Sequence, residues 1–166
     1  MVCGAPGGRA LTVLLLVEGQ SDRRALPILA RKLLGRGVGV TALILPKGDM
    51  LSATKVAALV RNAVARQRQF NKTVLCIDSE CTDISETRGR IDAVAQEVAR
   101  RLPQIPIRAV VVDHSLEGWL LGDRQALAGF LGLPERRLNY SSPEDYCRPA
   151  ELMERQFRRA GRDFSK

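Results

Sequence analysis

The stretch LTVLLLV at Leu11–Val17, followed directly by Glu18 and Gly19, decides the fold of this chain. The run is apolar throughout and too short for a typical helix, so it predicts a strand that is buried on both faces. Similar short apolar runs at 38–45, 73–77 and 107–112 predict three further strands. Buried strands of this kind are typical of parallel sheets.

Helical patterns separate the four expected strands. Apolar residues recur at helical spacing over 22–35, 53–64 and 91–102, and a further helix is expected over 116–131. Ser21 is expected to cap the first helix, whereas Pro27 fits only if that helix begins late or is kinked. We expect residues 46–49 to form a turn. The alternation predicts an α/β protein with a Rossmann-like, mainly parallel four-stranded sheet flanked by helices and joined by right-handed crossovers.

The length of 166 residues suits a single domain. We expect an α/β domain over 1–133 and a C-terminal helical extension over 134–166 that packs on the same domain. No apolar run reaches the roughly 18 residues of a membrane span, and a secretory signal is not expected. The four cysteines have scattered spacings and no CxxC pair, so we expect neither a disulfide scaffold nor a zinc site. A cytoplasmic location follows from this cysteine usage.

The net charge of +8 is unevenly distributed along the chain. Residues 23–72 carry eleven basic residues and one acidic residue, a net charge of +10. Residues 73–123 carry five basic and nine acidic residues, a net charge of −4. The basic stretch indicates a polyanionic partner such as DNA or RNA, although a solvated helix face is the alternative for any single cluster. The candidate phosphate contacts are Arg23, Arg24, Lys47 and Lys55.

Acidic residues follow three of the four expected strands. Glu18, Asp78 and Asp113 stand directly after them, and Glu80 and Asp83 come shortly after Asp78. Because the carboxyl ends of parallel strands share one edge of a sheet, Glu18 and the 78–83 cluster are expected to converge there. Carboxylate oxygens suit Mg²⁺ or Mn²⁺, which would relieve their mutual repulsion. The alternative is that such acids only cap turns and helices.

At these residues the chain resembles the Toprim superfamily, the metal-binding domain of topoisomerases, primases and OLD-type nucleases. The family pattern is Glu-Gly after the first strand and Asp-x-Asp after a later strand, which Glu18-Gly19 and Asp78 match. Glu80 departs from it, because a longer side chain replaces the second Asp. The resemblance implies a Toprim fold and metal-dependent cleavage of nucleic acid.

The chain is most similar to a small, stand-alone bacterial Toprim-like family of unknown function. The likeness covers most of the chain: LVEG at 16–19 with Asp22, HSLEGWLLGD at 114–123, Pro143-Glu144, and the terminal Phe164-Ser165-Lys166. It implies a role for Lys166 near the scissile phosphate and defence against mobile elements. Glu117 is a candidate further ligand, whereas Trp119 is expected in the core and His114 in a structural or phosphate hydrogen bond.

These residues together predict a Mg²⁺- or Mn²⁺-dependent nuclease. Asp78 and Glu80 would hold the metal, and Glu18 would be a shared ligand or general base. Asp22, Asp83 and Glu117 would bind a second metal or contact the ligands of the first. The first alternative is a non-catalytic nucleic-acid-binding module with a degenerate metal site. A phosphoacceptor domain using Asp78 and a nucleotide-binding protein fit less well, because no suitably placed Lys and no Walker or GxGxxG motif occurs. No membrane partner is expected, and a homodimer stays open.

Overall fold

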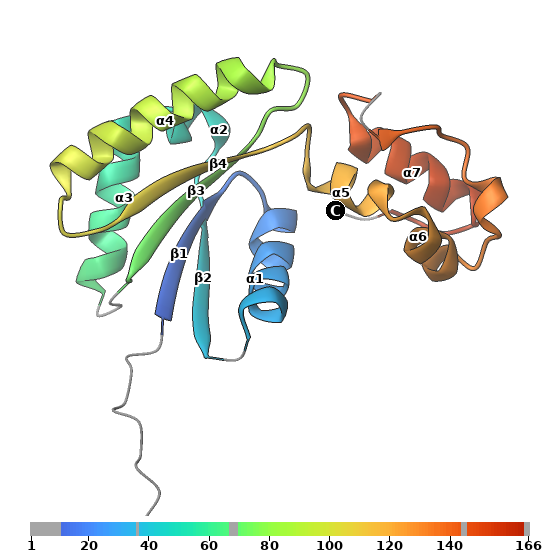
Figure 1. Ribbon diagram of the computed structural model, residues 1–166, viewed down its shortest axis with the longest axis horizontal. Helices are drawn as coiled ribbons and strands as arrows, with labels where there is room; N and C mark the ends of the chain where they lie inside the picture. Colours follow the sequence, from blue (N-terminus) through green and yellow to red (C-terminus); the bar gives the residue numbers. More distant parts are fainter. Residues whose placement is uncertain (1–10, 36, 67–69, 144–145, 165–166) are drawn as a thin grey trace, which may run out of the picture. The chain divides into compact units, whose positions relative to one another are not determined.

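The parallel sheet predicted from the sequence is present. A computed structural model describes residues 11–35, 37–66, 70–143 and 146–164 (Figure 1). Its strands lie in the order β2-β1-β3-β4, and β1 runs parallel to both of its neighbours. The predicted α/β class, with a parallel four-stranded sheet, is therefore confirmed. The strands are β1 (Leu11–Val17), β2 (Val38–Ile44), β3 (Lys72–Asp78) and β4 (Ile107–Val112).

The apolar run that predicted a buried strand forms β1, which lies inside the sheet. Leu14, Leu16 and Val17 are fully buried, because neighbouring strands and helices cover them. β1 pairs with β2 along its whole length and with β3 from Val13 to Leu16. The chain moves from β1 to β2 on one side and then to β3 on the other side of β1. The strand order therefore reverses between β1 and β3, which is where open α/β sheets bind ligands.

Helices connect the strands, as the alternation of the two patterns in the sequence predicted. α1 lies on one face of the sheet, whereas α3 and α4 lie on the other face (Figure 1). This placement follows from the strand order, because the chain reverses its direction across the sheet after β2. The helices are α1 (Gln20–Leu34), α2 (Lys47–Met50), α3 (Ala53–Ala65), α4 (Ile84–Arg101), α5 (Leu116–Gly122), α6 (Arg124–Leu131) and α7 (Pro149–Arg159), with a 3₁₀ helix, η1 (Glu135–Arg137).

The chain forms two compact units. The first comprises Met1–Cys76 and Ile91–Ala109, and it holds β1, β2 and most of β3 and β4. The second comprises Ile77–Arg90 and Val110–Lys166, and it holds the ends of β3 and β4, the loops after them, and α5, α6, η1 and α7. The predicted boundary at residue 133 stays a prediction.

The second unit has its own hydrophobic core. α6 contributes Leu127, Ala128 and Leu131, and α7 contributes Leu152 and Met153. Tyr140 is also buried here, and its hydroxyl donates a hydrogen bond of 2.7 Å to the carbonyl oxygen of Leu121. This hydrogen bond offsets the cost of burying the hydroxyl, because a phenol in an apolar core needs a hydrogen-bond partner.

Tyr140 makes the stability of the protein depend on alkaline pH. Desolvation raises the pKa of Tyr140 above its ordinary value of 10.0. The folded state therefore keeps the phenolic proton at a pH at which the unfolded chain releases it. The contribution to the free energy of unfolding is constant below about pH 10 and declines as the pH rises above it. Urea unfolding measures the free energy of unfolding between about pH 8 and about pH 11, and this free energy should fall more steeply for the wild type than for Tyr140→Phe. Equal slopes for the two proteins would contradict this prediction.

Local features of three predicted elements differ from expectation. The helix expected over 116–131 is broken, because the side chain of Asp123 accepts a hydrogen bond of 2.9 Å from the amide of Ala126 and caps α6. The short helix α2 replaces the turn expected over 46–49. The first helix begins at Gln20 with Gly19 as its cap, so Ser21 does not cap it. Pro27 lies inside this helix, although it cannot donate a backbone hydrogen bond.

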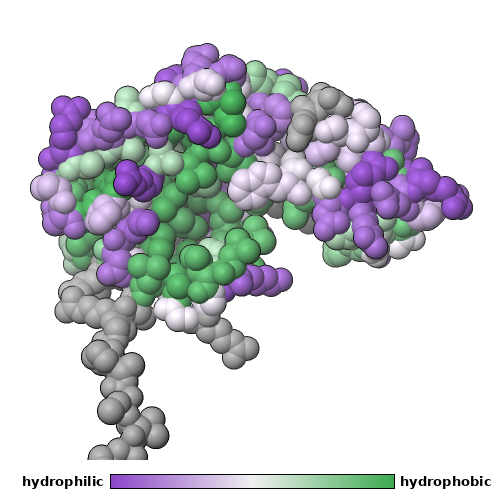
Figure 2. Space-filling model, in the orientation of Figure 1, coloured by the Kyte–Doolittle hydropathy of each residue, from purple (hydrophilic) through white to green (hydrophobic). Residues whose placement is uncertain are grey.

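Hydrophobic surface remains over α1. Ile28, Leu33 and Leu34 are each more than half exposed, and Figure 2 shows hydrophobic side chains gathered over this helix. Among the described residues, no helix is long and apolar enough to cross a membrane.

Candidate functional site at the strand ends

Two strand-end loops of the second unit are held together through their backbones. Asp78 is the last residue of β3 and the loop after it begins at Ser79, whereas the loop after β4 begins at Asp113. The amide of Ser79 donates to the carbonyl oxygen of Val112 at 2.9 Å, and the amide of Glu80 donates to that of His114 at 2.8 Å. The pairing of the two strands thus continues into their loops, and it fixes the backbone that carries the acidic residues.

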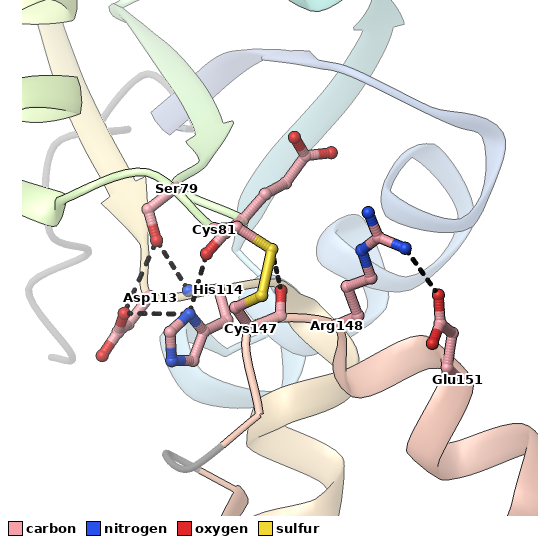
Figure 3. Close-up of a disulfide and its surroundings, with 8 residues drawn as sticks. Ser79, Cys81, Asp113, His114, Cys147, Arg148 and Glu151 are labelled. Carbon is pink, nitrogen blue, oxygen red and sulfur yellow. Dashed lines mark hydrogen bonds and ion pairs between the residues drawn. A yellow bond between two sulfur atoms is a disulfide. The ribbon is translucent and has the colours of Figure 1, made fainter.

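Ser79 fastens the same two loops through its side chain. It is fully buried, and its hydroxyl oxygen accepts a hydrogen bond of 2.7 Å from the amide of His114 (Figure 3). The hydroxyl also lies 3.5 Å from Oδ1 of Asp113, which is long for a hydrogen bond. This role of Ser79 was not predicted, because nothing in Asp78-Ser79-Glu80 distinguishes a structural serine from a spacer residue.

His114 takes the structural role expected of it. Its Nδ1 lies 2.8 Å from the carbonyl oxygen of Glu80 (Figure 3). Because a carbonyl oxygen only accepts, this contact requires the proton to sit on Nδ1. The carboxylate of Asp113 lies 3.8 Å from the same nitrogen and would pair with the ring when the ring is protonated. The ring thereby ties the loop after β4 to the loop after β3.

The backbone of both loops is strained. Glu80 has φ +51° and His114 has φ +56°, so both occupy the left-handed region without being glycine. This conformation costs about 1–2 kcal/mol for each ordinary residue. The backbone and side-chain hydrogen bonds of Ser79 and His114 offset that cost. Strain of this kind often occurs at functional sites, because the conformation aims side chains in a direction that relaxed backbone does not.

The structure places the predicted metal ligands in different settings. Asp78 is the last residue of β3 and is half-buried, whereas Glu80 is exposed in the loop after it. Glu18 is half-buried directly after β1 and belongs to the first unit. Glu117 accepts a hydrogen bond of 2.8 Å from the hydroxyl of Ser115 at the start of α5. Lys166 lies outside the described residues.

Two of the predicted supporting acids act on helix ends. Oδ1 of Asp83 accepts hydrogen bonds from the amides of Ser85 at 2.8 Å and Glu86 at 3.0 Å, which caps α4. Oδ2 of Asp22 accepts from the amide of Gly19 at 3.2 Å at the start of α1. The capping alternative considered for strand-end acids thus describes these contacts, and α4 begins several residues earlier than its apolar pattern predicted. The pattern D-x-x-E at 83–86 was the available signal for that start.

The acids do not form a complete cage for a metal. Within the described part of the chain, no three side chains of His, Cys, Asp or Glu come together as a metal-binding group. Two carboxylates remain close in sequence, that of Asp78 at the end of β3 and that of Glu80 in the loop after it. Mg²⁺ commonly binds to one or two carboxylates and completes its shell with water and phosphate oxygens. The donor set therefore fits Mg²⁺ or Mn²⁺ in this incomplete form and does not fit a cation that needs an all-protein cage.

The predicted phosphate contacts lie in the first unit. Arg23 and Arg24 are exposed on the first turn of α1. Lys47 begins α2, and Lys55 on α3 forms an ion pair with Asp49. This ion pair partly neutralises Lys55, so the arginines of α1 are the stronger candidates for phosphate contacts.

Trp119 is not in the core, contrary to expectation. It is 52% exposed on α5, and its neighbour Leu120 is 52% exposed as well. The buried face of this helix is formed instead by Leu116 and Leu121. The prediction was wrong because Trp119 lies outside the buried face of α5, which an apolar side chain alone does not reveal. An exposed indole is available for stacking on bases, which is the alternative to a place in the core.

A disulfide corrects the expectation for the cysteines. Cys81 and Cys147 are bonded across 66 residues, with their Cα atoms 4.7 Å apart (Figure 3). Their spacing gave no signal, because the pairing joins the loop after β3 to the segment before α7. Cys76 is half-buried and takes no part in this disulfide. Because this bond forms, cysteine usage no longer supports a reducing compartment.

The parallel sheet and its strand-end acids define an α/β protein of the Rossmann-like class. The chain belongs to the family described as "Domain of unknown function (DUF4276)", whose model matches residues 17–166. The match begins at the last residue of β1 and includes both strand-end loops. No curated protein and no solved structure matches the chain.

Proposed function

We propose that this protein is a metal-dependent phosphodiester hydrolase that acts on nucleic acid, as its resemblance to Toprim proteins implies. The observation that carries the proposal is the loop after β3. Asp78 ends β3, and Glu80 follows two residues later in a loop whose backbone is hydrogen-bonded to Val112 and His114 and is in the left-handed region at Glu80. A fixed pair of carboxylates beyond a parallel strand is where this fold class places its ligands.

The metal would contribute charge neutralisation at the phosphate and a more acidic bound water. Asp78 and Glu80 would hold it. Ser79 and His114 would act as positioning residues, because their hydrogen bonds fix the backbone between the two carboxylates. The assignments of Glu18 as ligand or base and of Lys166 near the phosphate stay predictions from the sequence.

Nucleic acid as the substrate is supported by charge and by one aromatic residue. The first unit presents Arg23 and Arg24 to solvent, and the second unit presents Trp119. Arginine binds backbone phosphates, and an exposed indole stacks on bases without regard to sequence. Dimerisation, a cytoplasmic location and a role in defence stay predictions.

One set of observations favours a second candidate, a nucleic-acid-binding module without catalysis. The carboxylates of Asp83 and Glu117 take part in local hydrogen bonds. Within the residues that the structure describes, no metal group of three such side chains forms. Glu80 also replaces the second Asp of the Toprim pattern, and its side chain is longer.

A metal titration separates the two candidates. Calorimetric titration of the purified chain with Mn²⁺, in the presence and absence of a single-stranded oligonucleotide, should show uptake that tightens roughly tenfold with the oligonucleotide, because phosphate oxygens complete the shell. Asp78→Asn should abolish this uptake. Oligonucleotide binding without any Mn²⁺ uptake by the wild type would instead support the module.

A further inference from the structure

A pocket in the second unit is lined by three arginines. Its volume is about 380 Å³, and its lining consists of Leu133, Arg136, Arg137, Asn139 and Arg159. Pockets that hold small ligands begin at about 300 Å³, so the space suits a group the size of a nucleotide. None of these residues belongs to the strand-end loops or to the basic stretch over 23–72.

Local packing explains why the arginines meet there. Leu138, directly after η1, is buried, and both arginines of η1 stay exposed beside it. α7 buries Leu152, Met153 and Gln156 and ends at the exposed Arg159. Nη1 of Arg159 donates a hydrogen bond of 3.4 Å to the carbonyl oxygen of Arg137. This contact places the end of α7 against η1.

The walls of the pocket are held by further hydrogen bonds. The guanidinium of Arg124 donates to the carbonyl oxygens of Leu138, at 3.1 Å, and of Tyr140. The buried side chain of Gln156 accepts a hydrogen bond of 3.3 Å from the amide of Asn139. The segment between η1 and Tyr140 is therefore fixed before any ligand arrives, which lowers the entropic cost of binding.

The arginines of the pocket carry positive charge that no ion pair between described residues neutralises. Within the ranges that the structure describes, Arg136, Arg137 and Arg159 form no ion pair with a carboxylate. Two neighbouring acids form ion pairs with other arginines. Oε1 of Glu135 lies 3.4 Å from Nε of Arg124, and Oε1 of Glu154 lies 2.8 Å from Nη2 of Arg158. Figure 2 shows hydrophilic side chains gathered over α6 and α7. Three adjacent guanidinium groups that form no ion pair within the described ranges create a positive potential that an anion would relieve.

We propose that this pocket binds a phosphate group of a nucleic-acid strand. Guanidinium groups match phosphate oxygens in shape and hydrogen bonding, and the arginine fork binds them in pairs. Leu133 supplies apolar surface for the sugar beside the phosphate. The identification of this phosphate as part of a nucleic-acid strand rests on the function proposed above. The pocket would hold a strand at a position distinct from the strand-end acids.

The test compares two double variants that lose the same charge. Arg137→Gln with Arg159→Gln removes two pocket arginines, whereas Arg148→Gln with Arg158→Gln removes two exposed arginines whose partners are Glu151 and Glu154. Fluorescence anisotropy with a labelled single-stranded oligonucleotide in EDTA measures binding without metal. The pocket variant should bind about tenfold more weakly than the control, with a shallower salt dependence, because phosphate contacts release counterions. Circular dichroism verifies folding, and Arg137→Lys with Arg159→Lys should recover part of the affinity.

A second arm identifies the source of the phosphate. Adenosine monophosphate is titrated into each variant by calorimetry. Weaker oligonucleotide binding by the pocket variant supports a nucleic-acid strand as the ligand. Loss of monophosphate binding with unchanged oligonucleotide binding would assign the pocket to a free nucleotide and overturn the proposal of a strand. Equal effects of the two double variants in both arms would overturn the proposal. Because the arms contain no metal, failure of catalysis leaves this result unaffected.

Discussion

Replacing Cys81 and Cys147 together by serine should lower the free energy of unfolding by about 4 kcal/mol. The bond closes a loop of 66 residues, and the chain-entropy model gives about 4 kcal/mol for a loop of that length. The loop is long because the bonded cysteines come from the segment after β3 and the segment before α7. Both residues are exposed, so serine leaves no cavity and the loss of the cross-link dominates the effect.

Urea unfolding of the oxidised wild type, the reduced wild type and the double serine variant measures this effect. Reduction with dithiothreitol should shift the wild type to the midpoint of the serine variant and leave that variant unchanged. If the oxidised wild type and the serine variant unfold at the same urea concentration, the bond contributes no stability and the prediction is wrong.

Asp78→Asn should lower the rate of metal-dependent cleavage about a thousandfold. The metal contributes several kcal/mol to the transition state, and about 1.4 kcal/mol corresponds to a tenfold rate. Asparagine keeps the shape of the side chain, but it removes the charge that holds the cation. Glu80→Gln should have a smaller effect, because Glu80 is exposed and water can replace its oxygen in the metal shell.

Asp92→Asn is the matched control for this loss. Asp92 is half-buried on α4, outside the strand-end loops. Its substitution replaces a carboxylate by an amide, as Asp78→Asn does. Its activity should stay within about twofold of the wild type, since surface substitutions away from a site have small effects. Equal activities of Asp78→Asn and the wild type would remove Asp78 from the mechanism.

The sequence predicted the sheet well because the strands are short, apolar and bounded by acids or glycines. Leu11–Val17 forms the buried interior strand that its composition indicated. The helical breaks were harder to predict, because apolar spacing continues across Asp123 although its side chain starts a new helix there.

Other features depended on contacts between segments far apart in the chain. The pairing of Cys81 with Cys147 and the meeting of Arg137 with Arg159 join positions 66 and 22 residues apart, which spacing alone does not signal. Ser79 gained its role from the amide of His114, again from a different loop. The acids of the candidate site could be found from their places after strands, whereas the contacts that position them could not.

Cleavage of labelled oligonucleotides by the purified wild type tests the central claim most directly. Single- and double-stranded DNA and RNA are incubated with the protein in Mg²⁺, in Mn²⁺ and in EDTA, and the products are separated by length. The account predicts that at least one substrate is shortened in the presence of metal and that none is shortened in EDTA. Intact substrates in every metal condition, at protein concentrations that bind them fully, would contradict it.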